Sequence, residues 1–159
     1  MRLVRMACLS MTDRTAFLAS LTSAFHAAHR SWTRAVGRRL RQFGVTGGAA
    51  LALIAVSRAN GATPGMHQIE LAELIGISGS SLVRFVDQLC DAGLVERQQD
   101  DTNRRAKQVV LTSSGKVLAD RLEEELHLMR RQALSHLPLA DLEAAERFAN
   151  AMVAAEAQL

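Results

Sequence analysis

The chain has 159 residues, of which 48% are hydrophobic and only 4% aromatic, and its formal net charge is +3. This length fits one domain, or one domain with a helical extension, and the hydrophobic content can bury a core, which argues against intrinsic disorder. The two cysteines, Cys8 and Cys90, show no pairing pattern, and no segment approaches the roughly 20 apolar residues of a membrane span. We therefore expect a cytoplasmic, mainly helical protein without a membrane segment.

The positive charge is concentrated near the N-terminus. Residues 1–45 contain eight arginines and one aspartate, whereas residues 66–112 contain five basic and seven acidic residues. Net charge alone therefore does not indicate a nucleic-acid partner, and such a prediction depends on where individual arginines fall.

A long helix is predicted from Asp13 to about Gln42, after residues 1–11, which we expect to form a disordered tail. A helix of this length spans roughly 45 Å, more than one small domain can cover. We expect much of it to pack against a second subunit. The apolar residues that recur along it at spacings of three and four, or their sums, are Leu18, Leu21, Phe25, Trp32, Val36, Leu40 and Phe43.

The remaining predicted elements are helices over 46–58, 67–75 and 79–92, strands over 95–98 and 107–111, and helices over 113–135 and 139–157. Residues 49–56 are apolar nearly all round, as in a buried helix. In the helix that follows, Ile69, Ala72 and Ile75 are expected to face inward. The polar stretch between the two strands predicts a β-hairpin with a long tip.

The segment 68–111 has the order of a winged helix-turn-helix: helix, tight turn, helix and hairpin. Gly76 permits the turn, and Ser78 can cap the second helix. Near the start of this helix the apolar residues face inward and leave small residues and an arginine outside, where they can reach base edges in a major groove. The candidate DNA contacts in this helix are Ser78, Gly79, Ser80, Ser81 and Arg84.

Several stretches of the sequence resemble the multiple antibiotic resistance regulator (MarR) family. They are LAELIGIS at 71–78, RFVDQL at 84–89, GLVER at 93–97, RRAK at 104–107 and LTSSG at 111–115. The resemblance extends over about residues 13–157 and implies a winged helix-turn-helix over 46–112, with a helical dimerisation region formed by 12–45 and 113–159. It also implies a ligand-responsive repressor that binds double-stranded DNA at a pseudo-palindromic operator as a homodimer, with a ligand cleft between the two regions.

The same resemblance assigns roles in the hairpin, or wing. Arg104, Arg105 and Lys107 are expected to contact DNA, and Asp87 of the recognition helix is expected to pair with Arg105 and so brace the wing. The family commonly has an aspartate two residues before this arginine, where this sequence has Asn103. The departure removes one negative charge from the wing tip.

Four arginines of the first predicted helix fall within a sector of about 80°, opposite its apolar stripe. We call this set, Arg30, Arg34, Arg38 and Arg41, the arginine ridge. The simplest interpretation is a face that is solvated or paired with acids, for example with the run Glu123–Glu125 of a partner helix. Contact with phosphate is the alternative.

Two ionisable residues, His29 and Arg39, lie within the apolar stripe itself. Buried cations need partners. An anionic aromatic ligand, stacked on Trp32 and held by Arg39, would be one, and these three residues form the candidate ligand site. An internal carboxylate or backbone carbonyl is an equally good partner.

Other functions have less support in the sequence. His26 and His29 could form half of a metal site, but no third ligand stands near them, and Cys90 fits a small core residue, so we expect neither a metal nor a cofactor. No phosphate-cradling glycine motif, nucleophile elbow or catalytic histidine–acid pair is present, which argues against an enzyme. A protein-interaction module without DNA binding, or a regulator that senses thiols or metals, is the alternative.

Overall fold

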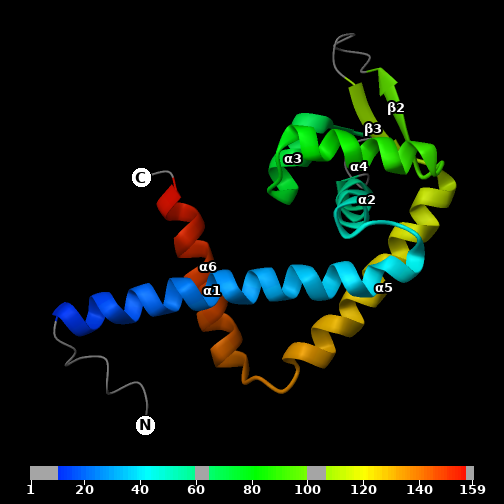
Figure 1. Cartoon of the computed structure of the whole chain (residues 1–159). Coiled ribbons are helices and arrows are strands. Elements are labelled where there is room, and N and C mark those ends of the chain that lie inside the picture. The colour runs from blue at the N-terminus through cyan, green and yellow to red at the C-terminus, as the bar shows by residue number, and fades with distance from the viewer. Residues whose placement is uncertain (1–10, 60–64, 100–106, 157–159) are drawn as a thin grey trace.

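The computed structural model describes residues 11–59, 65–99 and 107–156, and its elements follow the predicted order (Figure 1). They are α1 (Met11–Leu40), the 3-10 helix η2 (Arg41–Phe43), α2 (Gly47–Ala59), β1 (Met66–His67), α3 (Gln68–Ile75), α4 (Gly79–Asp91), β2 (Val95–Gln99), β3 (Lys107–Leu111), α5 (Ser113–Leu134) and α6 (Leu139–Glu156). The predicted fold class, mainly helical with a winged helix-turn-helix, is confirmed.

The sheet has one strand that the sequence did not indicate. β1 pairs antiparallel with β3, with Met66 opposite Val109, so the sheet has three strands in the order β1-β3-β2. His67, predicted as the first residue of the following helix, is instead its N-cap, and its backbone N–H donates to the Glu70 carboxylate at 3.3 Å. A two-residue strand is too short to show the alternation from which strands are predicted.

The inward face of α3 differs from the prediction in one residue. Ile69 was expected to face the core, but 75% of it is exposed, whereas Leu71 and Ala72 are buried and Ile75 is half-buried. Two residues along a helix correspond to a rotation of about 200°, so burying Leu71 turns Ile69 towards solvent.

The core surrounds α2, which the sequence correctly predicted as a buried helix. Every residue from Ala52 to Val56 is buried, as are Ala49 and Ala50. The residues that pack around α2 come from α1 (Val36, Leu40), α3 (Leu71), α4 (Leu82, Val86, Leu89), the hairpin (Val95, Val109) and α5 (Ala119, Leu122, Leu126). Within the described ranges no single helix has the length and apolarity to cross a membrane; only α1–η2 and α2 taken together, at an angle of 83°, do.

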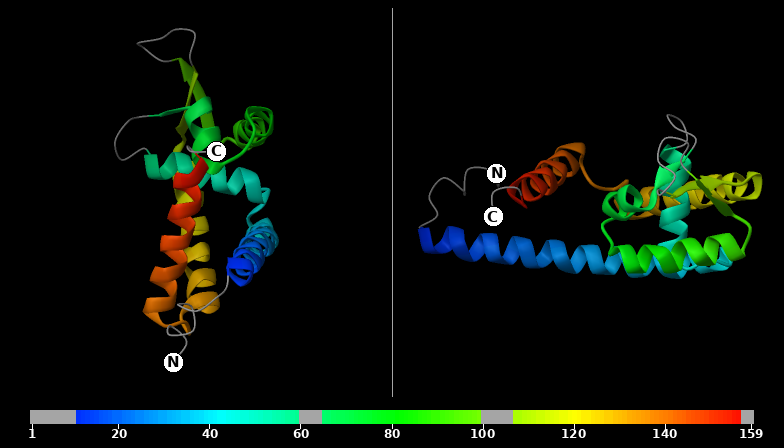
Figure 2. Two further views of the ribbon diagram at one scale, coloured as in Figure 1. Left: turned by 90° about the vertical axis from the view of Figure 1, so that its left-hand side faces the viewer. Right: turned by 90° about the horizontal axis from the view of Figure 1, so that it is seen from above.

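The terminal helices lie largely outside this core. α1 runs outward from the core, α6 crosses it near its middle, and α5 connects the hairpin to α6 (Figures 1 and 2). The rings of Phe25 and Phe148 meet edge to face there, with centroids 5.6 Å apart. No residue of α6 whose side chain is described is fully buried. Large apolar side chains stay exposed on these helices, among them Phe17, Leu18, Phe25, Leu128, Leu134, Leu139 and Val153.

Candidate nucleic-acid interface

The start of α4 is shaped by a tight turn and a serine cap. Gly76 has the left-handed conformation (φ 68°) that ends α3, and the N–H of Ile77 donates to the carbonyl of Ala72 at 3.0 Å. The Ser78 hydroxyl then accepts from the N–H of Ser81 at 3.3 Å, as the sequence predicted for this cap. The first turn of α4 is thereby fixed with its free N–H groups at the surface, where they can face phosphate.

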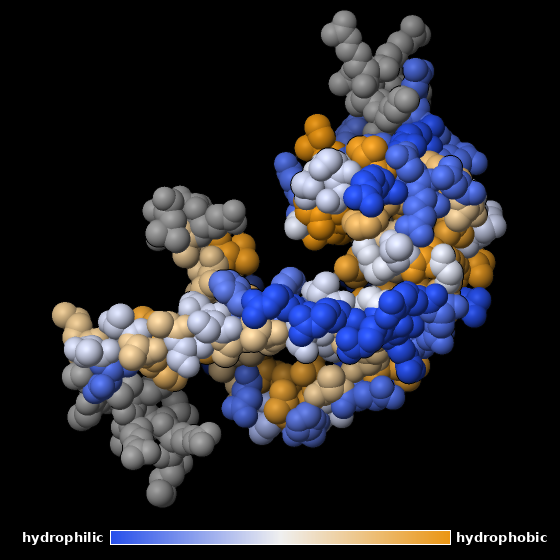
Figure 3. Space-filling model, in the orientation of Figure 1, coloured by the Kyte–Doolittle hydropathy of each residue, from blue (hydrophilic) through white to orange (hydrophobic). Residues whose placement is uncertain are grey.

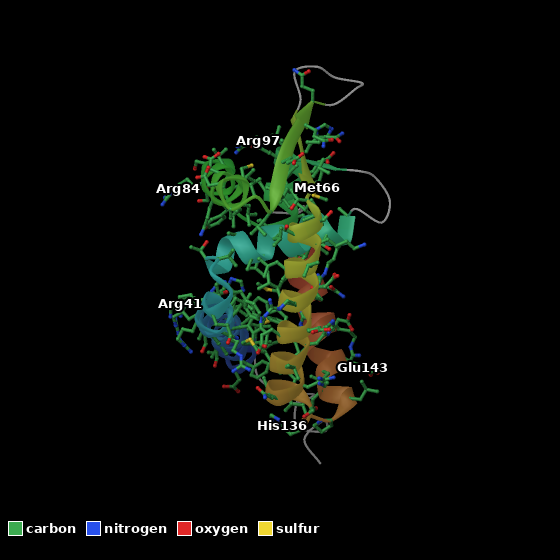
Figure 4. All side chains as sticks on the ribbon, turned by 90° about the vertical axis from the view of Figure 1, so that its right-hand side faces the viewer. Arg41, Met66, Arg84, Arg97, His136 and Glu143 are labelled. Carbon is green, nitrogen blue, oxygen red and sulfur yellow. The ribbon has the colours of Figure 1, made fainter. Side chains whose placement is uncertain are left out.

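α4 buries one face and presents the other. Leu82, Val86 and Leu89 are buried in the core. Of the predicted DNA contacts on this helix, Ser78, Gly79, Ser80 and Arg84 are exposed, and Ser81 is half-buried, within 2.9 Å of the Ser78 hydroxyl. Arg84 projects from the side of the molecule that also carries Arg41 (Figure 4). The structure therefore brings the candidate residues of α4 together on one accessible surface.

The wing is held against α4 by a residue that the sequence-based prediction did not single out. An Nη2 of Arg97, on β2, donates to Asp87 Oδ1 on α4 at 2.6 Å, and Nη1 lies 3.8 Å from Cys90 Sγ. Arg97 stands two residues after buried Val95, so both point to the same face of the strand, towards α4. This spacing was the signal available in the sequence.

The tip of the wing lies outside the described residues. Arg104 and Arg105 fall in the gap 100–106, and the side chain of Lys107 is also outside the description. The pairing of Asp87 with Arg105 therefore stays a prediction, while the pairing of Asp87 with Arg97 is observed.

Thr112 joins the recognition helix, the wing and α5. Its hydroxyl donates to the Gly93 carbonyl at 2.8 Å and accepts from the Gly115 N–H at 3.0 Å, which confirms the predicted cap of α5. Its own N–H donates to the Leu94 carbonyl at 3.1 Å. Gly115 lies so close to this carbonyl that an added Cβ would be 1.9 Å from its oxygen. These contacts hold the base of the hairpin against the start of α5.

A family model described as the MarR family matches residues 43–106, from the end of η2 to the tip of the wing. This segment, less than half of the chain, is similar to the MarR family. Among solved structures, the transcriptional regulator PA3341 is 26% identical, with a TM-score of 0.78, over 87% of this chain and 99% of that one. MepR of S. aureus, solved with DNA, is 18% identical (TM-score 0.75, 85% and 96% covered), and a Listeria monocytogenes protein complexed with 26mer DNA is 16% identical (0.73, 82% and 85%).

The predicted ligand residues do not meet around one cavity. Arg39 forms an ion pair through its Nε with Glu125, so an internal carboxylate supplies the partner that the sequence left open. His29 is exposed. Trp32 lines a hollow of about 470 Å³ between α1 and α5, which neither His29 nor Arg39 borders. In the part of the chain that is described, no group of three or more His, Cys, Asp or Glu could hold a metal ion.

A larger cavity, of about 520 Å³, lies between the winged helix-turn-helix and α5. Its walls are mostly apolar and come from α2, α3, Met66 and α5, with two arginines, Arg58 and Arg130, at its edge. Both arginines bind the same carboxylate: Glu123 Oε1 lies 2.5 Å from Arg58 Nη2 and 3.5 Å from Arg130 Nη1. Nothing in the sequence pattern indicated that these two arginines would both bind Glu123.

Glu123 is an ionised group held between these arginines. Desolvation raises its pKa, but the hydrogen bond and charge of Arg58, together with Arg130, outweigh this and hold the pKa of Glu123 below its ordinary value. The other carboxylate oxygen, Oε2, is buried without a hydrogen-bond partner. Glu123 and Glu125 are thus engaged within the chain, so neither is available as a free acid for the arginine ridge of a second subunit.

Proposed function

We propose that this chain is a DNA-binding transcriptional regulator that acts as a homodimer on a pseudo-palindromic operator, with ligand-responsive repression as its mode of action. The observation that carries the proposal is the exposed start of α4, with Ser80 and Arg84 on a helix capped by Ser78. This helix is fixed to the neighbouring wing by the Asp87–Arg97 pair. The DNA complexes of MepR and of the Listeria monocytogenes protein, which share the fold, support it.

In this proposal α4 reads the major groove. Ser78, Gly79 and Ser81, at the helix N-terminus, contact phosphate, while Ser80 and Arg84 reach base edges. An arginine that binds a guanine with two hydrogen bonds contributes roughly 1–3 kcal/mol of discrimination between bases. Arg104, Arg105 and Lys107 of the wing contact the adjacent minor groove, where arginines favour the strong negative potential.

The helices over 12–45 and 113–159 form the dimer interface, and 46–112 forms the reading unit. The apolar side chains left exposed on α1, α5 and α6 support this division, because a lone chain leaves them in contact with water. Two reading units held by one interface can address half-sites about one helical turn apart, roughly 34 Å. A regulator of this kind acts where the DNA is, and its expected location is therefore the cytoplasm of a bacterial-type cell.

The proposed ligand is a small molecule with one anionic group, whose remaining part is aromatic or otherwise apolar. The cavity of about 520 Å³ suits it, because its apolar walls end at Arg58 and Arg130. An anion that bound these arginines would compete with Glu123 and so disturb the contact between α2 and α5. The site at His29, Trp32 and Arg39 is the alternative, and it requires the ligand to displace Glu125 from Arg39.

The test is a gel-shift and footprinting experiment on the DNA that flanks the chain's own gene, at several salt concentrations. Binding should weaken steeply with salt because phosphate contacts release counterions. Arg84→Ala should relax sequence preference and Arg105→Ala should weaken binding severely, while Arg147→Ala, on α6, serves as the matched control. Absence of duplex binding even at low salt would support the protein-interaction module instead. If no small aromatic acid alters the melting temperature of the protein, the proposal of a ligand is refuted.

A further inference from the structure

The arginine ridge is a strongly charged surface that the reading unit does not explain. Arg30, Arg34 and Arg38 follow one another at four-residue spacing on α1, and Arg41 continues the row in η2. All four are exposed, and none forms an ion pair with a described residue. Arg39, which lies among them in the sequence but on another face, is neutralised by Glu125. The ridge therefore carries four uncompensated positive charges over about 16 Å of helix.

Three of these arginines surround a hollow where α1 meets the start of α2. The hollow, of about 480 Å³, is lined by Arg34, Arg38 and Arg41 and by Gly37, Thr46 and Gly47. The two glycines bring the backbones close together, since a Cβ on Gly47 would lie 2.9 Å from the Gly37 Cα. The arginines thus border a concave surface with a backbone floor, which has room for a bound group.

Two contacts connect the hollow to α4. The Thr46 hydroxyl donates to Gln88 Oε1 of α4 at 2.9 Å. Two residues along the chain from Thr46, Gly48 lies against the ring of Phe85, where an added Cβ would be 2.2 Å from a ring carbon. Both contacts fix the start of α2 relative to α4, so a group held in the hollow has a defined position relative to the surface that reads DNA.

The ridge and the recognition helix also face the same way. Arg41 and Arg84 project from one side of the molecule in Figure 4. Figure 3 shows hydrophilic side chains gathered along the half of α1 nearest to α2, on the face that also carries α4. A long polyanion lying on α4 can therefore extend to the ridge.

Like charges at four-residue spacing on a helix repel one another, so this row is unfavourable until a counter-charge reaches it. Two acids of α5, Glu123 and Glu125, are already bound to other arginines, and no described acid of α5, Asp120 and Glu124 included, forms an ion pair with the ridge. Phosphates match arginine in charge and in the geometry of two parallel hydrogen bonds.

We propose that the arginine ridge binds the phosphate backbone of the same DNA duplex that α4 reads, with a phosphate group held in the hollow between Arg34, Arg38 and Arg41. This inference rests on the proposed function and extends it. Each subunit then contacts DNA at a second place, and this contact adds affinity without sequence preference, because phosphates carry no base information.

The test uses a position where the structure has room for a new side chain. A Cβ at Gly37 would meet no atom within 4 Å, and Gly37 lines the hollow, so Gly37→Glu introduces a carboxylate there without a clash at its Cβ, and Gly37→Gln is the neutral control of the same shape. The probe is a mixed-sequence duplex of about 30 base pairs, roughly three helical turns, in parallel with a genomic fragment that the wild type protects. Affinity is measured by fluorescence anisotropy across a salt series.

Gly37→Glu should bind both duplexes at least about tenfold more weakly than Gly37→Gln. The magnitude of the slope of log affinity against log salt should fall by about 0.9 for each phosphate that the variant no longer neutralises. The triple variant Arg34→Ala/Arg38→Ala/Arg41→Ala should bind more weakly still, again by the same factor on both duplexes.

Equal affinity and slope for the Glu and Gln variants, with Arg105→Ala still impaired, would overturn this inference and leave the proposed function standing. A ridge variant that changes the sedimentation of the dimer rather than its DNA affinity would overturn it too, in favour of a protein partner. No wild-type binding to either duplex would overturn the proposed function itself.

Discussion

The same substitution, glycine to alanine, should have opposite effects on stability at two positions of this chain. In the interior of a helix alanine is favoured over glycine by roughly 1 kcal/mol. At Gly37, in the C-terminal part of α1, a new methyl group meets nothing within 4 Å. Gly37→Ala should therefore increase the free energy of unfolding by an amount close to this value.

At Gly115 the close contact reverses the sign. The methyl group would lie 1.9 Å from the Leu94 carbonyl oxygen and 2.9 Å from the carbonyl carbon, which are backbone atoms that no rotamer change can move. This carbonyl also accepts the hydrogen bond of the Thr112 N–H, so displacing it strains the base of the wing. Overpacking of this kind costs roughly 1–3 kcal/mol, more than the helix preference returns. Because the clash is with backbone, we take the upper part of this range, roughly 2–3 kcal/mol, and after the helix preference of roughly 1 kcal/mol is subtracted, Gly115→Ala should lower the free energy of unfolding by about 1–2 kcal/mol.

Thermal unfolding of both variants and the wild type, at one protein concentration, measures the difference. For a chain of this size 1 kcal/mol shifts the melting temperature by roughly 2–4 °C, so Gly37→Ala should melt higher than wild type and Gly115→Ala lower. Equal concentration matters because, in the proposed dimer, association of the chains stabilises the folded state. A Gly115→Ala variant that melts at or above the wild-type temperature would refute the assignment of this glycine to close packing between α5 and the hairpin.

Three further predictions concern single side chains. Thr112→Val removes the hydroxyl that caps α5, so it should lower the free energy of unfolding measured in urea by about 1 kcal/mol. Thr112→Ser keeps the hydroxyl and should not lower it. An equal decrease in both variants would refute a role for the hydroxyl. Because Arg58 holds the pKa of Glu123 below its ordinary value of 4.5, the ionised carboxylate stabilises the fold above that value and ceases to do so as pH falls through the lowered pKa. The stability difference between wild type and Glu123→Gln should therefore shrink on acidification, and a constant difference would contradict this. Desolvation raises the pKa of Cys90, partly opposed by Arg97, so in a Cys8→Ser background iodoacetamide should modify it more slowly at neutral pH than it modifies free cysteine; rapid modification would revive thiol sensing.

The sequence predicted the features that depend on local chemistry. Apolar periodicity indicated the long helices, and glycines in left-handed conformation at Gly44, Gly76 and Gly93 stand where elements end. Serine and threonine caps at Ser78 and Thr112 act as their positions indicated. These signals lie within a few residues of the structure they specify.

Features that depend on which distant side chains meet were not predicted, although the spacing of Arg97 from Val95 showed which face of its strand Arg97 would take. The Asp87–Arg97 pair, the choice of Glu125 as the partner of Arg39, and the convergence of Arg58 and Arg130 on one carboxylate all join residues brought together by packing. Residues 66–67 form a strand because they pair with β3. In the candidate site, the residues of α4 were named in advance, whereas Arg97, which pairs with Asp87, was not.

The exposed apolar faces of α1 and α6 have a consequence for the abundance of the protein. If a second copy must cover them, dilution itself unfolds or destabilises the chain, since the folded state gains stability only as partners become available. Newly made chains below the dissociation constant would present these helices to proteases and be removed. The cell would then contain either enough chains to form dimers or very few folded chains. DNA binding would therefore begin over a narrow range of chain concentration.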